Sequence, residues 1–172
     1  DRAMRSTTGA RVRLLPRLAL ASLFLLAGTT PVTAQDPITI TDVDGNVVAI
    51  EDASRVATLG GVFTETAYAL GAQDQVAAID ASSFYPPEAL AEKPNFGYYR
   101  FLSAEPVLAQ SPSLIIGNDE TGPPEVVAQL RDAGVPILLL PDNNDVQAAR
   151  DLIQTLGMIF GREEAARDLV AT

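Results

Sequence analysis

Apolar residues along this chain form short, largely uninterrupted runs that alternate with segments of helical spacing. The runs occupy residues 55–59, 76–79, 114–116 and 135–140. Helical spacing occupies residues 64–70, residues 124–133 and a long tract from Val146 onward. Strands covered on both faces read as continuous apolar runs, and their alternation with helices indicates a parallel sheet. We therefore expect an α/β fold: a Rossmann-like lobe whose parallel central sheet is flanked by helices.

Turn residues sharpen this prediction. Residues 38–41 and 47–50 carry alternating patterns, and Asp44-Gly45 between them predicts a β-hairpin. Gly71 stands where the first helix should end, and Gly161 divides the long helical tract in two.

The first 34 residues predict an export signal rather than part of the fold. Met4 is followed by four arginines and no acidic residue, then by an apolar stretch at residues 18–27 and by Val32-Thr33-Ala34. A basic segment, a short apolar core and a small-residue site are the three parts of a secretory signal peptide. The apolar stretch is about half the length of a spanning helix. We expect residues 1–34 to be a signal peptide with a short upstream extension, cleaved after Ala34.

Composition then limits the chemistry. The five arginines and one aspartate of residues 1–34 leave 7 basic and 21 acidic side chains in residues 35–172, a net charge of −14. Such a chain does not favour nucleic acid or anionic lipid as partners. The sequence contains no cysteine and no histidine, so disulfides, thiolate ligands and the commonest general base are all absent from it.

Nucleotide-binding and hydrolase motifs are missing as well. The first strand of the predicted sheet ends in Gly60-Gly61, but Glu65 stands where a dinucleotide-binding loop would need its third glycine. No Gly-x-Ser-x-Gly motif and no Walker A motif is present. These absences indicate a binding protein rather than an enzyme.

The most unusual segment is residues 85–100, which holds three of the four tyrosines: Tyr85, Tyr98 and Tyr99. If residues 97–102 are extended, Tyr98 and Arg100 project from one face and Tyr99 from the other. A guanidinium beside a phenol favours the phenolate, a hard ligand that suits Fe(III), and an arginine can also pair with a ligand carboxylate. The alternative is a half-buried tyrosine beside an arginine in a surface ion pair.

Several blocks of the sequence match one family of transport proteins. They are residues 55–61, 64–65, 68–72, 80–87, 97–105, 121–124 and 129–136. From about Ile38 to its end the chain resembles the periplasmic haem-binding proteins of bacterial ABC haem importers, within the wider class of siderophore and cobalamin binders. The motifs Tyr85-Pro86-Pro87, Gly97-Tyr98-x-Arg100 and Gly122-Pro123-Pro124 are the most specific to the haem branch.

The resemblance implies two Rossmann-like lobes joined by a long helix, with the ligand held between them. On this basis residues 35–143 are the N-terminal substrate-binding lobe and residues 144–172 begin the interlobe helix. Because the chain stops within a helical pattern, we expect the C-terminal lobe to be missing from it.

The resemblance also implies the cargo and the partners. The cargo is haem b, carried as the transported ligand to an inner-membrane ABC permease, with an outer-membrane haem receptor system as a further candidate partner. Tyr98 matches the family's iron ligand and Arg100 its propionate-binding arginine, with Tyr85 as the second candidate for the iron. Glu65 is the candidate for permease docking. Any histidine acting as a second axial ligand would lie in the missing part.

Two other functions stay open. One is binding of a ferric siderophore or cobalamin by a protein of the same class. The other is an exported α/β enzyme.

Overall fold

A computed structural model describes residues 37–141 and 145–172. The signal peptide predicted for residues 1–34 and the lobe boundary predicted at residue 143 lie outside the described residues. None of the helices in the described part combines the length and the apolar character that crossing a membrane requires.

A four-stranded parallel sheet forms the centre of the fold, in the order β4-β3-β5-β6. Its strands are β3 (Val56–Leu59), β4 (Val76–Ile79), β5 (Leu114–Asn118) and β6 (Ile137–Leu140). Ile115 of β5 stands in register with Ala57 of β3 on one side and with Ile137 of β6 on the other. The predicted parallel sheet is therefore confirmed.

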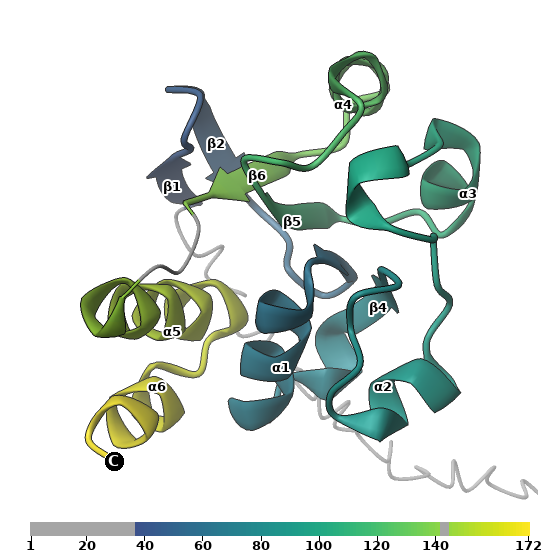
Figure 1. Cartoon of the computed structure of the whole chain (residues 1–172). Helices are drawn as coiled ribbons and strands as arrows, with labels where there is room; N and C mark the ends of the chain where they lie inside the picture. The colour runs from purple at the N-terminus through teal and green to yellow at the C-terminus, as the bar shows by residue number, and fades with distance from the viewer. Residues whose placement is uncertain (1–36, 142–144) are drawn as a thin grey trace, which may run out of the picture. The chain divides into compact units, whose positions relative to one another are not determined.

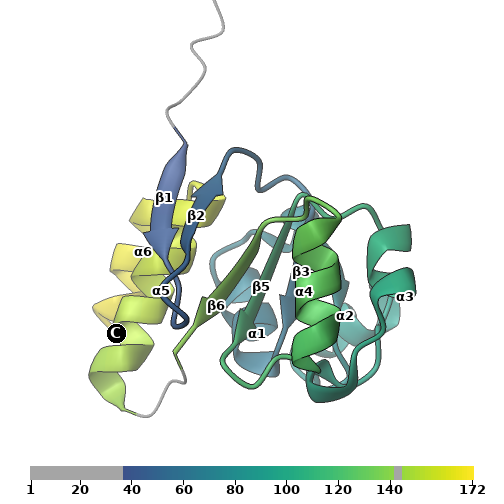
Figure 2. The ribbon, with the colours of Figure 1, turned by 90° about the horizontal axis from the view of Figure 1, so that it is seen from above.

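Helices cover both faces of this sheet (Figure 1, Figure 2). One face packs against α1 (Gly61–Ala69) and α5 (Val146–Phe160), and the other against α3 (Ala104–Ala109) and α4 (Pro124–Asp132). Since successive side chains of a strand point to opposite faces, Leu114 and Ile116 join the first core and Ile115 joins the second. The remaining helical elements are η1 (Gln73–Gln75), α2 (Pro87–Glu92), η2 (Tyr99–Phe101) and α6 (Glu163–Val170).

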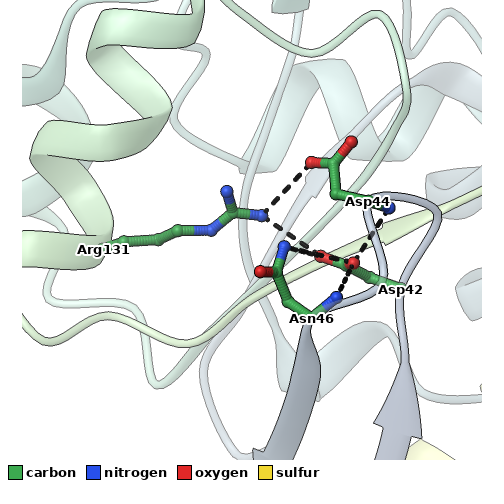
Figure 3. A network of polar contacts seen from close by, with 4 residues as sticks. All are labelled: Asp42, Asp44, Asn46 and Arg131. Atoms are coloured by element: carbon green, nitrogen blue, oxygen red, sulfur yellow. Dashed lines mark hydrogen bonds and ion pairs between the residues drawn. The ribbon is translucent and has the colours of Figure 1, made fainter.

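An antiparallel hairpin of β1 (Ile38–Thr41) and β2 (Val47–Ile50) is attached to β6 and α4 through its turn. The Val43 backbone N–H donates to the Leu139 carbonyl at 2.9 Å. The Asp42 carboxylate accepts the Asn46 backbone N–H at 2.8 Å and an Arg131 guanidinium N–H at 3.1 Å (Figure 3). The hairpin predicted from Asp44-Gly45 is confirmed, and an ion pair fastens it to the last turn of α4.

The long helical tract divides as predicted. Gly161 ends α5 in the left-handed conformation, with φ 64°, and α6 follows it. Gly157 has a packing role: a Cβ there would lie 2.4 Å from the Ala166 Cβ, so the missing side chain lets α6 approach α5. The glycine that weakens α5 locally thus permits its contact with the next helix.

Element boundaries differ slightly from the prediction. The first helix begins at Gly61 rather than residue 64, because the Gly61 backbone N–H finds an acceptor in the Ser82 hydroxyl at 3.0 Å. The last strand begins at Ile137 rather than residue 135, since the Val135 backbone N–H donates to the Leu130 carbonyl of α4 at 3.2 Å and not to a neighbouring strand.

Candidate functional site

A buried aspartate at the carboxyl end of β4 organises the edge of the sheet. Asp80 is fully buried, and its carboxylate accepts the backbone N–H groups of Gly60 and Ser82, both at 3.0 Å, and that of Tyr99 at 3.4 Å. The Ser82 and Ser83 hydroxyls donate to the same carboxylate. One side chain therefore joins the turn after β3, the loop after β4 and the tyrosine segment. In open α/β sheets, ligands bind outside the carboxyl ends of the strands, where these three segments meet.

The tyrosine segment is not extended as predicted: Tyr99 to Phe101 form the 3₁₀ turn η2, and only Tyr98 before it is extended. The Phe101 backbone N–H donates to the Tyr98 carbonyl at 2.9 Å and closes this turn. Strand-like alternation therefore does not govern the side chains here. The predicted placement of Tyr99 on the opposite face is wrong, because the Tyr98 and Tyr99 rings lie 4.6 Å apart and Arg100 contacts both. The two tyrosines differ in burial, since Tyr99 is buried whereas Tyr98 is 39% exposed.

Arg100 contacts both tyrosines. The carbon of its guanidinium lies 5.9 Å from the Tyr98 ring centroid and 5.5 Å from that of Tyr99, within the range of cation–π attraction. Its Nε donates to the Tyr99 hydroxyl at 3.3 Å, a bond that is the main reason why the pKa of Arg100 is raised. A second nitrogen forms an ion pair with Glu120, which also accepts the Tyr99 hydroxyl at 3.4 Å. The structure thus brings Tyr98 and Arg100 together and adds a carboxylate to them.

The electrostatic effect on Tyr98 is opposite to the prediction. Its pKa is raised above the ordinary tyrosine value, first because of a hydrogen bond with the Tyr99 side chain and then because of desolvation. Arg100 does lower this pKa, but these effects outweigh it. Since an ordinary tyrosine ionises with a pKa of about 10, the raised pKa keeps Tyr98 a protonated phenol at physiological pH.

Tyr85 lies in the loop beside the tyrosine segment. The Ala81 backbone N–H donates to the Gly97 carbonyl at 2.8 Å, so the loop after β4 runs next to the residues that precede Tyr98. Tyr85 is 63% exposed, and Phe84 before it is also exposed. Neither side chain is part of the core, so both are available for contact with a ligand.

Glu65 lies on α1 with its side chain exposed. Within the described residues, no hydrogen bond or ion pair connects it to Tyr85, Tyr98 or Arg100. The structure therefore brings Tyr98 and Arg100 together, whereas no hydrogen bond, ion pair or ring contact among the described residues joins Tyr85 or Glu65 to them.

Two residues of this edge were missed in the sequence. Asp80 directly follows one buried strand, and Glu120 stands two residues beyond another. Because the carboxyl ends of parallel strands meet at one edge of a sheet, polar residues after β4 and β5 should lie together. The location of Asp80 and Glu120 just after buried strands was the sequence feature that could have identified them.

Two hollows among the described residues lie elsewhere. One of about 500 Å³ is bordered by Ile38, Ile50 and the end of α5, and another of about 590 Å³ lies beside α3. Tyr98, Arg100 and Glu120 line neither of them. The candidate site is an open surface, the form that one wall of a two-walled cleft would take.

Comparison with solved structures gives similarity over most of the chain. The periplasmic haem-binding protein RhuT from Roseiflexus sp. RS-1, in its apo form, is 38% identical with a TM-score of 0.64, over 70% of this chain and 46% of that one. The haem-binding protein HmuT is 31% identical with a TM-score of 0.69, over 83% of this chain and 48% of that one.

Two curated relatives match as well. The uncharacterised ABC transporter substrate-binding lipoprotein YvrC of Bacillus subtilis is 26% identical over 166 residues, which are 89% of this chain and 52% of that protein. The vitamin B12-binding protein of Vibrio cholerae is 36% identical over 85 residues, 49% of this chain and 30% of its own length. The chain thus spans at most about half the length of these relatives.

The protein family described as "Periplasmic binding protein" matches residues 56–172, the part that contains the parallel sheet, the tyrosine segment and the helices α5 and α6. This chain belongs to the periplasmic binding protein family.

Proposed function

We propose that this chain is the N-terminal lobe of a periplasmic protein that captures haem b and delivers it to an inner-membrane ABC permease. The observation that carries the proposal is the half-exposed phenol of Tyr98, held beside the Arg100 guanidinium at the carboxyl edge of the sheet. Further support comes from the solved relatives RhuT and HmuT, both of which are described as haem-binding proteins.

In this proposal Tyr98 ligates the haem iron. Fe(III) favours a hard, anionic oxygen, and tyrosinate is such a ligand. The raised pKa of Tyr98 means that the iron itself must displace the phenolic proton. Nearby positive charge favours the phenolate, so Arg100 assists that step.

Arg100 has the second role, pairing with a haem propionate. Its fork of N–H donors matches a carboxylate, and its side chain is 43% exposed. The exposed aromatic side chains of Phe84, Tyr85 and Phe101 offer apolar area to the porphyrin. Tyr85 is the second candidate for the iron.

The proposed transport route requires export and docking. The signal peptide inferred for residues 1–34 would direct the protein to the periplasm, where cleavage after Ala34 releases it. Glu65, exposed on α1, is the proposed contact with the permease. No reaction is catalysed, because capture and release of haem are the whole function.

Titration of the full-length protein with hemin tests the proposal. We expect the high-spin Fe(III) tyrosinate spectrum for the unmodified protein and for Tyr85→Phe, and its loss in Tyr98→Phe. Tyr85→Phe is the matched control, since it removes one exposed phenol and no charge. A Tyr98→Phe protein that keeps the spectrum would rule out the iron assignment.

A second candidate cargo is a corrinoid, because several of the curated relatives are vitamin B12-binding proteins. Cobalamin carries its own axial ligands, so it needs no tyrosinate from the protein. Tight binding of cyanocobalamin by the full-length protein, together with weak binding of hemin, would favour this function over haem capture.

A further inference from the structure

The arginine assigned to the ligand is already paired with a carboxylate of the chain. Arg100 forms its ion pair with Glu120, and the two side chains are 43% and 40% exposed. The buried Tyr99 connects the two side chains, because its hydroxyl accepts a hydrogen bond from Arg100 and donates one to Glu120. A ligand carboxylate that approaches Arg100 therefore meets Glu120 at the same guanidinium.

The backbone sets this arrangement. The Gly122 N–H donates to the Tyr99 carbonyl at 3.0 Å, and the Leu102 N–H donates to the Gly122 carbonyl at 2.9 Å. These two bonds hold the turn after β5 against η2. The Glu120 N–H in turn donates to the Asn118 side chain at 3.2 Å. Glu120 is thus placed opposite Arg100 by the fold and not only by its own flexible side chain.

We propose that Glu120 is an internal competitor for the ligand's carboxylate: it holds Arg100 in the ligand-free protein and gives way to a porphyrin carboxylate on binding. This inference rests on the proposed function, which assigns Arg100 to a propionate. Two carboxylates at one guanidinium repel each other, so Glu120 lowers affinity for a carboxylate-bearing porphyrin. A porphyrin whose carboxylates are esterified carries no such charge, and Glu120 should leave its affinity unchanged.

Glu120→Gln isolates this effect. The glutamine oxygen can still accept from Arg100 and Tyr99, so the orientation of the guanidinium is kept while the charge is removed. Asp119→Asn is the matched control, because Asp119 is the exposed neighbour and takes no part in any ion pair among the described residues. Both variants remove one negative charge from the same turn.

The experiment measures dissociation constants of the full-length proteins for four probes: hemin, hemin dimethyl ester, iron-free protoporphyrin and its dimethyl ester. Exposed ion pairs are weak, so we expect Glu120→Gln to bind both free acids about threefold more tightly, with a smaller gain at high salt. Both esters and the Asp119→Asn protein should show no such gain.

The outcomes separate this inference from the proposed function. An equal effect on acids and esters, or weaker binding of the acids by Glu120→Gln, overturns the role of Glu120. If Tyr98→Phe leaves the hemin spectrum unchanged while the acid-specific gain persists with iron-free protoporphyrin, the iron assignment fails and Glu120 keeps its role. Binding of none of the four probes by any variant overturns both.

Discussion

Two arginine–carboxylate pairs in this chain have the same chemistry and different surroundings. The Asp42 carboxylate is completely buried and accepts bonds from Asn46 and a neighbouring backbone amide in addition to Arg131. Both partners of the Arg100–Glu120 pair are two-fifths exposed. Buried, fully bonded carboxylates maintain structure, whereas an exposed pair contributes little stability and stays available to a ligand. The comparison indicates that Arg131 fastens the hairpin, and it supports the proposal that Arg100 binds a ligand carboxylate.

The largest effect should follow from removing the buried carboxylate. Asp42→Ala leaves the Asp44 and Asn46 backbone amides without their acceptor and Arg131 with only its longer ion pair to Asp44 at 3.7 Å, and we expect the free energy of unfolding to fall by about 2–3 kcal/mol. Urea denaturation measures this loss. Affinity for hemin should change by less than about twofold, since Asp42 is joined to α4 and not to the tyrosine segment. A stability equal to that of the unmodified protein would contradict the structural role of this pair.

Asp80 is buried like Asp42, but it lies at the edge of the sheet that carries the candidate site, where it joins three segments of the chain. Asp80→Asn keeps one oxygen acceptor and places an amide group among N–H donors. We expect unfolding to be easier by about 2 kcal/mol, accompanied by weaker hemin binding as the Tyr98 segment loosens. Comparing hemin affinity for Asp80→Asn with that for Asp42→Ala separates the two roles. Loss of stability with unchanged hemin affinity would show that Asp80 does not position the site.

The exposed pair should hardly matter for stability. Glu120→Ala should change the free energy of unfolding by less than about 1 kcal/mol, because solvent screens the charges. The same urea denaturation checks this value, with Asp42→Ala as the reference. A loss as large as that of Asp42→Ala would mean that Glu120 is structural rather than a competitor for the ligand.

The smallest expected effect is on the ionisation of Tyr98 in the ligand-free protein. A raised pKa means that the phenol keeps its proton to higher pH than an ordinary tyrosine, which ionises near about 10. Ultraviolet titration of tyrosinate, taken as the difference between the unmodified protein and Tyr98→Phe, measures this pKa. Tyr99→Phe removes the main cause and should lower it. Ionisation of Tyr98 below the ordinary value would contradict the hydrogen bond with Tyr99.

Much of the fold follows from local patterns. Apolar runs predicted all four strands of the sheet, and Gly161 predicted the break between α5 and α6, because burial and backbone conformation restrict the residue types at those positions. The 3₁₀ turn η2 was missed because it depends on backbone bonds with the turn around Gly122, more than 20 residues away.

The site was predicted only in part for the same reason. Tyr98 and Arg100 are close in sequence, and the motif Gly97-Tyr98-x-Arg100 pointed to them through the resemblance to haem-binding proteins. Glu120 and Asp80 reach them from the ends of other strands. The pKa of Tyr98 is raised mainly by a hydrogen bond with the Tyr99 side chain. The sequence pattern did not predict this hydrogen bond.

The structure of the full-length protein with haem bound tests the central claim most directly. We expect the Tyr98 phenolate oxygen to be a ligand of the iron and the Arg100 guanidinium to contact a propionate, with Glu120 moved away from it. A haem iron ligated by another residue, with Arg100 still paired to Glu120, would contradict this account.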